Sequence, residues 1–95
     1  MSAEIALLTL IVRIPLAKSL KEKRRVRQSF SKKLKVRFNI AVAETDFQDQ
    51  WQRAEISIAS VNTKWVELEK TMAYVLKMAE SQYEMEIIED KIERI

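Results

Sequence analysis

The chain of 95 residues contains no cysteine, no histidine and no glycine. Without cysteine it can form no disulfide, no thiolate metal site and no cysteine nucleophile. Without histidine it lacks the commonest general base and the commonest metal ligand near neutral pH. Without glycine it cannot form a Walker phosphate loop or a dinucleotide fingerprint, both of which bring bare backbone close to phosphate. We therefore expect no enzyme, no cofactor and no metal site.

A long hydrophobic run is also missing. The longest, residues 5–14, is too short to cross a bilayer and is interrupted by Thr9 and Arg13. No basic segment precedes it and no A-x-A cleavage site follows it, so we do not expect it to be a signal peptide. We expect no membrane partner. The lack of cysteine is typical of a reducing compartment, and we expect a cytoplasmic location.

The first half of the chain predicts a strand, a capped helix and a second strand. Residues 5–14 are rich in Ile, Leu and Val and predict a strand that Pro15 closes. The S-x-x-E spacing of residues 19–22 is a capping box, so a helix should run to about residue 36. Residues 38–44 alternate between large apolar and smaller side chains, as in a half-buried strand.

The second half predicts another strand, a helix and a last strand. Residues 56–59 alternate like a strand, residues 64–82 place their large apolar side chains on one helical face, and residues 85–94 form an acidic strand. The order is βαββαβ, which predicts an α+β, ferredoxin-like fold. We expect residues 1–95 to form a single domain, in which two helices cover one face of a four-stranded antiparallel sheet.

Ten of the Lys and Arg residues lie between residues 18 and 37, where Glu22 is the only acid. On the first predicted helix Val26, Phe30 and Leu34 form an apolar stripe that should face the sheet. The opposite sector, about 100° wide, should face solvent. Its bases are Lys21, Arg24, Arg25, Lys32 and Lys35.

Like charges three and four positions apart repel by a few tenths of a kcal/mol per pair, as for Lys21 with Arg24 and Arg25. This cost favours a surface that binds a polyanion. Two alternatives remain: a solvated face that keeps the protein soluble, and a face that binds an acidic protein. The open face of the predicted sheet lacks aromatic residues, so base stacking on the sheet is not expected. We expect the helix to contact phosphates, which positions a nucleic acid without reading its sequence.

Lys23 and Glu44 both point toward the predicted core. Lys23 falls within the apolar stripe of its helix, and Glu44 shares the parity of the core-facing residues of its strand. Because a buried lone charge costs several kcal/mol, we hypothesise that the two form a structural ion pair. The alternative is that both lie at the ends of their elements and reach water independently.

Two aromatic residues, Phe47 and Trp51, lie in the polar connection between the second and third strands. They can fold back over the edge of the core. They can also stack on an unpaired base beside the basic helix, which would add roughly 1–3 kcal/mol per base. The sequence leaves both interpretations open.

Three segments resemble the YlxP-like family of small bacterial proteins, whose domain is of unknown function. They are SLKEKR at residues 19–24, FNIAVAE at residues 38–44 and DQWQRA at residues 49–54. The resemblance covers nearly the whole chain and implies a ferredoxin-like fold. It also implies a gene often found among those for translation initiation and ribosome maturation, which points toward RNA. It implies no activity, cofactor or catalytic residue.

We therefore predict a small nucleic-acid-binding protein whose partner is the phosphate backbone of RNA, in the ribosome or an assembly intermediate. The alternative is a structural or regulatory homo-oligomer, such as a homodimer, that associates through the open sheet face or a sheet edge. An enzyme that uses carboxylates such as Glu44 with a nearby lysine is the least favoured class.

Overall fold

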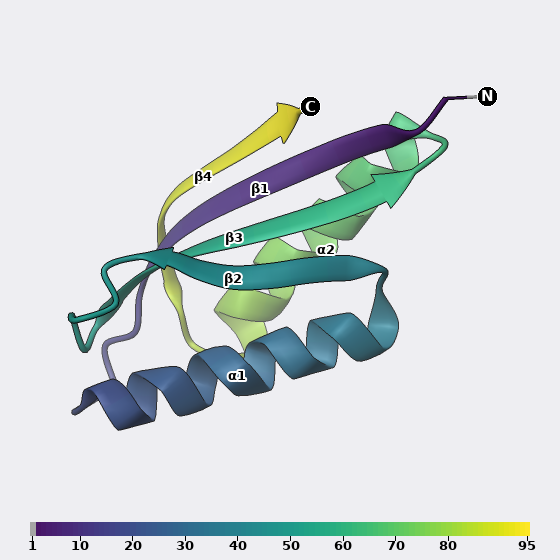
Figure 1. The fold of residues 1–95 in the computed structure, drawn as a ribbon. Coiled ribbons are helices and arrows are strands. Elements are labelled where there is room, and N and C mark those ends of the chain that lie inside the picture. The colour runs from purple at the N-terminus through teal and green to yellow at the C-terminus, as the bar shows by residue number, and fades with distance from the viewer. Residues whose placement is uncertain (1) are drawn as a thin grey trace.

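Four strands and two helices make up the computed structural model, which describes residues 2–95 (Figure 1). The chain runs through β1 (Glu4–Arg13), α1 (Leu20–Arg37), β2 (Ile40–Asp46), β3 (Arg53–Asn62), α2 (Trp65–Gln82) and β4 (Glu86–Arg94). The strands form one antiparallel sheet in the order β2-β3-β1-β4. The predicted ferredoxin-like βαββαβ fold is confirmed.

β1 lies in the middle of the sheet and pairs with β3 along its whole length, from Glu4 opposite Asn62 to Arg13 opposite Arg53. This long pairing explains why β3 extends well beyond the predicted residues 56–59. On its other side β1 pairs with β4, and a bulge shifts the register next to Val12.

The prediction that β2 begins at Phe38 is wrong, since the strand begins at Ile40. Phe38 instead caps the C-terminus of α1, where its N–H donates to the carbonyl of Leu34 at 2.8 Å. Its ring packs edge-on against Tyr74, with centroids 5.2 Å apart. The aromatic side chain that suggested a strand therefore joins the two helices.

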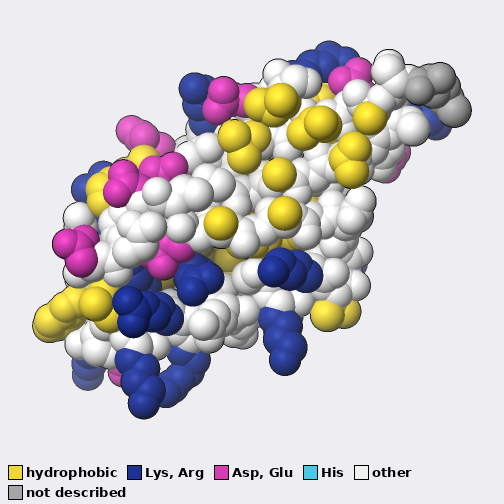
Figure 2. Space-filling model, in the orientation of Figure 1, with side chains coloured by type: hydrophobic (Ala, Val, Ile, Leu, Met, Phe, Trp, Pro, Cys, Tyr) yellow, Lys and Arg dark blue, Asp and Glu magenta, His cyan; other side chains and the backbone are white. Residues whose placement is uncertain are grey.

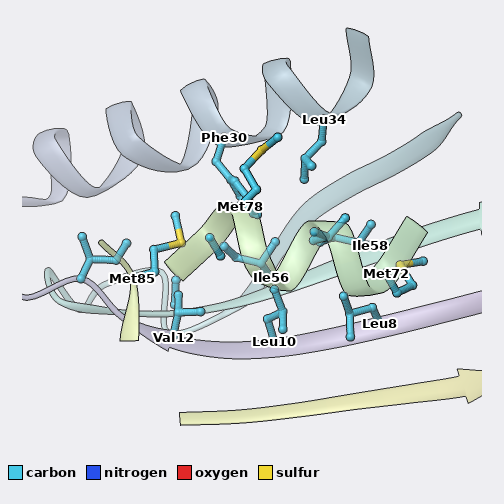
Figure 3. Close-up of a cluster of buried hydrophobic side chains, with 14 of the residues drawn as sticks. Leu8, Leu10, Val12, Phe30, Leu34, Ile56, Ile58, Met72, Met78 and Met85 are labelled. Carbon is cyan, nitrogen blue, oxygen red and sulfur yellow. The ribbon is translucent and has the colours of Figure 1, made fainter. Parts of the chain in front are cut away.

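Alternation along β1 and β3 places one set of side chains under the helices and the other on an uncovered face. Figure 3 shows that both helices contribute to the covered side, with Phe30 and Leu34 coming from α1 and Met72 and Met78 from α2. Both helices thus lie on one face of the sheet, as predicted. The core-facing residues of the two central strands are fully buried or nearly so: Ala6, Leu8, Leu10, Val12, Ala54, Ile56, Ile58 and Ser60.

The ends of β1 and β4 are joined by a bidentate ion pair. Arg94 donates to the Glu4 carboxylate through Nη2 at 2.6 Å and through Nε at 3.2 Å. These hydrogen bonds hold the pKa of Glu4 below its ordinary value and raise that of Arg94. Because the folded-state pKa of Glu4 is lowered, the pair stabilises the fold near neutral pH, and the contribution is lost as the pH falls through that pKa.

Candidate nucleic-acid interface

The basic helix begins at a side-chain cap. Ser19 accepts a hydrogen bond from the N–H of Glu22 at 3.1 Å. The Glu22 carboxylate in turn accepts from the N–H of Lys18, and an acid in the first turn also complements the helix dipole. The only acid in this helix is thus bonded to backbone, and among residues 2–95 it forms no ion pair within 4.0 Å with the bases that follow it.

The five bases predicted to face solvent are all exposed in the structure. None of them has a carboxylate oxygen within 4.0 Å among residues 2–95. The outermost two, Lys21 and Lys35, are separated by about 21 Å along the helix axis. The result is a row of unpaired positive charge on the side of α1 that faces away from Phe30 and Leu34. The row consists of Lys21, Arg24, Arg25, Lys32 and Lys35.

A polar groove of about 420 Å³ lies between the C-terminal half of α1 and β2. Two of the predicted bases, Lys32 and Lys35, line it together with Arg27. In Figure 2 Lys and Arg side chains gather along α1, while apolar side chains lie over the strands. The groove thus brings part of the basic row next to the open edge of the sheet at β2.

Lys23 is completely buried, and its ammonium lies 2.7 Å from a carboxylate oxygen of Glu44. The second carboxylate oxygen of Glu44 lies 3.3 Å from Nε of Arg27. The structure therefore brings Lys23 and Glu44 together and adds a second base to them. Pairing of this kind is what makes a buried ammonium tolerable.

The same ammonium also donates to the carbonyl of Phe47 in the β2–β3 loop at 2.8 Å and to that of Arg53, the first residue of β3, at 3.2 Å. It lies 3.5 Å from the carbonyl of Gln48 in the loop. At the other end of the loop, the amide of Gln52 donates to the carbonyl of Ala17 at 3.1 Å and to that of Pro15 at 3.2 Å. The loop is thereby fastened both to α1 and to the segment that precedes it.

A family model described as a protein of unknown function (DUF503) matches residues 5–92. The chain belongs to this family. It is also 39% identical over 70 residues to the uncharacterized protein YlxP of Bacillus subtilis (strain 168), an alignment that covers 74% of this chain and 76% of that protein. Neither match assigns an activity to the DUF503 domain.

Solved structures resemble the DUF503 domain in fold only. The de novo designed protein Foldit4 superposes with a TM-score of 0.57 at 11% identity, over 97% of both chains. A second designed protein, LFR1 1, described as having a ferredoxin fold, gives a TM-score of 0.44 at 14% identity, over 97% of this chain and 82% of that one. In the part of the DUF503 domain that the structure describes, no helix is long and apolar enough to span a membrane.

Two polar residues of the groove were missed in the sequence, Gln28 and Ser31. Gln28 falls within the same helical sector as the five bases, so a helical wheel that scored hydrogen-bonding groups as well as charge would have included it.

The two aromatic residues of the β2–β3 loop in the DUF503 domain differ in their exposure to solvent. Phe47 is half-buried beneath the guanidinium of Arg53, 4.4 Å from its ring centroid, whereas Trp51 is 55% exposed.

Proposed function

We propose that the protein is a cytoplasmic RNA-binding protein, associated with the ribosome or an assembly intermediate, that holds phosphates on the exposed face of α1. The observation that carries this proposal is the row of five bases without carboxylate partners in residues 2–95. Repulsion within such a row costs stability that interspersed acids would relieve, and phosphates would relieve it on binding.

The proposed mode of binding is contact with the backbone. Bases in a row on one helix match the repeated charge of a phosphate chain, whereas sequence readout needs contacts with base edges. RNA is favoured over DNA by the resemblance to YlxP-like proteins, whose genes often lie among those for translation initiation and ribosome maturation. The open sheet face carries no aromatic side chain at positions such as Thr9, Ala43 and Ser57, so an RRM-like stacking surface is not part of the proposal.

Reversing Arg24 and Arg25 to Glu is expected to weaken RNA binding and to flatten its dependence on salt. Each lost phosphate contact lowers the slope of log affinity against log salt by roughly 0.7–0.9. The measurement is a titration of labelled duplex and single-stranded RNA over a range of KCl concentrations. A matched control reverses Lys64 and Lys91, which are exposed bases outside α1, and changes the net charge equally. RNA binding that is insensitive to salt, or equally weakened by the control, would contradict the proposal.

A homodimer is the second candidate, favoured by the apolar character of the uncovered sheet face. Ile5 lies opposite Val61 there, and the two side chains are 40% and 45% exposed. If this face is the functional surface, sedimentation should show a dimer that persists in high salt and has no affinity for RNA. Val61→Lys should then dissociate it, since a charge would be buried at the interface. A monomer at all salt concentrations would remove this candidate.

A further inference from the structure

A hollow of about 500 Å³ opens where the β2–β3 loop meets the end of the sheet. Its walls come from loop residues 49–52, from Arg13 and Arg53, and from Ile88. Its volume falls in the range of pockets that bind small ligands, about 300–1,000 Å³. Trp51, which stands in this wall, is the most exposed aromatic side chain of the described residues, and an exposed indole leaves a large apolar surface in water.

Two arginines stand directly opposite each other at this hollow. Arg13 and Arg53 are partners in the β1–β3 register, a placement in which like charges destabilise a sheet. Arg13 is only loosely compensated, since its Nε lies 4.0 Å from a Glu86 oxygen and its side chain is 55% exposed. Asp49, also in the wall, forms no ion pair within 4.0 Å among residues 2–95.

The loop that carries Trp51 is held in place before any ligand arrives. The buried ammonium of Lys23 fixes its first carbonyls, and Gln52 bridges its last turn to the chain ahead of α1. Phe47 occupies a left-handed conformation with φ of 61°, which is costly for an aromatic residue and persists only where surrounding contacts enforce it. A rigid, exposed aromatic loses little conformational entropy when it binds.

We propose that this hollow binds one unpaired nucleotide of RNA, with the base stacked on Trp51 and its phosphate held by Arg13 or Arg53. The proposal rests on the proposed function, because it assumes that RNA is the ligand. Stacking on an aromatic side chain accepts any base, while an arginine supplies a bidentate partner for a phosphate. Since Lys23 ties the loop to the first turns of α1, the hollow lies at the same end of the molecule as the N-terminal part of the basic row. A bound strand then has phosphate contacts on α1 and one stacked base at the loop.

The chain has two tryptophans, so a Trp65→Phe background makes Trp51 a single fluorescent reporter. The probe is an eight-residue single-stranded oligoadenylate, and its control is a strand of equal length and charge that is abasic throughout. The base-bearing strand should quench Trp51 emission, whereas the abasic strand should not. Trp51→Ala should weaken binding of oligoadenylate by roughly fivefold to a hundredfold, while Trp51→Phe should retain part of the affinity. Neither substitution should change the salt slope or affinity for the abasic strand.

The outcomes separate this inference from the proposed function. If RNA binds with a steep salt slope that Arg24 and Arg25 control, but Trp51→Ala has no effect and Trp51 is not quenched, the nucleotide site is overturned and the helix proposal stands. A protein that binds Trp51 in place of RNA would give that same result. If no strand binds at low salt, both proposals fail. Because Trp51 is more than half exposed, Trp51→Ala should keep the melting temperature of the parent protein, which is checked by circular dichroism.

Discussion

Replacing Lys23 with alanine is expected to lower the free energy of unfolding by about 3–5 kcal/mol, the usual cost of removing one partner from a buried ion pair. The substitution leaves Glu44, whose side chain is 8% exposed, with Arg27 as its nearest base. It also removes the donor that reaches the carbonyls of Phe47 and Arg53. Since small domains are stable by about 5–15 kcal/mol in total, this loss is a large part of the whole.

The measurement is equilibrium unfolding in urea, with Lys33→Ala as the control. Lys33 lies on the same helix and is exposed, and the only hydrogen bond of its side chain among residues 2–95 is a 3.4 Å contact with Gln82. Its loss should change stability by no more than about 0.5 kcal/mol. Lys23→Ala should also shift the emission of Trp51 in the folded protein, because the loop loses its attachment to α1. Equal costs for the two substitutions would show that the buried ammonium does not stabilise the fold.

Phe30→Ala is expected to cost about 3–5 kcal/mol, because it removes a large ring from a site that cannot fully collapse. Phe30 is fully buried between α1 and the sheet, and its ring meets Tyr83 edge-on with centroids 5.3 Å apart. The contact attaches the middle of the basic helix to the C-cap residue of α2. Phe30 therefore contributes to the stability of the domain that carries the basic helix, although the side chain itself faces away from solvent.

The control for Phe30 is Val36→Ala, which truncates an apolar side chain of the same helix that is 85% exposed. It should change the unfolding free energy by less than about 0.5 kcal/mol. Both are measured by thermal and urea unfolding. At temperatures where Phe30→Ala remains folded, its RNA affinity should follow the parent's, since no base is changed. A Phe30→Ala cost close to that of Val36→Ala would mean that the helix is not anchored through this ring.

The periodicity of apolar residues predicted most of the fold, because the spacing of side chains alone separates the two faces of each helix and strand. It placed Phe30 and Leu34 in the core, and it identified Lys23 as a base on the wrong side of its helix. The backbone carbonyls that accept hydrogen bonds from Lys23 could not be predicted from the sequence. Their positions depend on the left-handed conformation of Phe47, and no glycine at this position indicates such a conformation. The sequence also could not predict that Arg13 and Arg53 lie opposite each other. The strand register depends on the whole pairing of β1 with β3, and no local sequence feature indicates it.

The sheet order also separates charge across the molecule. α1 lies along β2 at one edge, whereas β4, with Glu86, Glu89, Asp90 and Glu93, forms the opposite edge (Figure 1). A molecule with a basic and an acidic side has a dipole, and the field of a polyanion turns such a dipole before the surfaces touch. Productive encounters then become more frequent than random orientation allows, and their rate falls as salt screens the field. The edge position of β4 thus bears on how fast a phosphate-rich partner is captured.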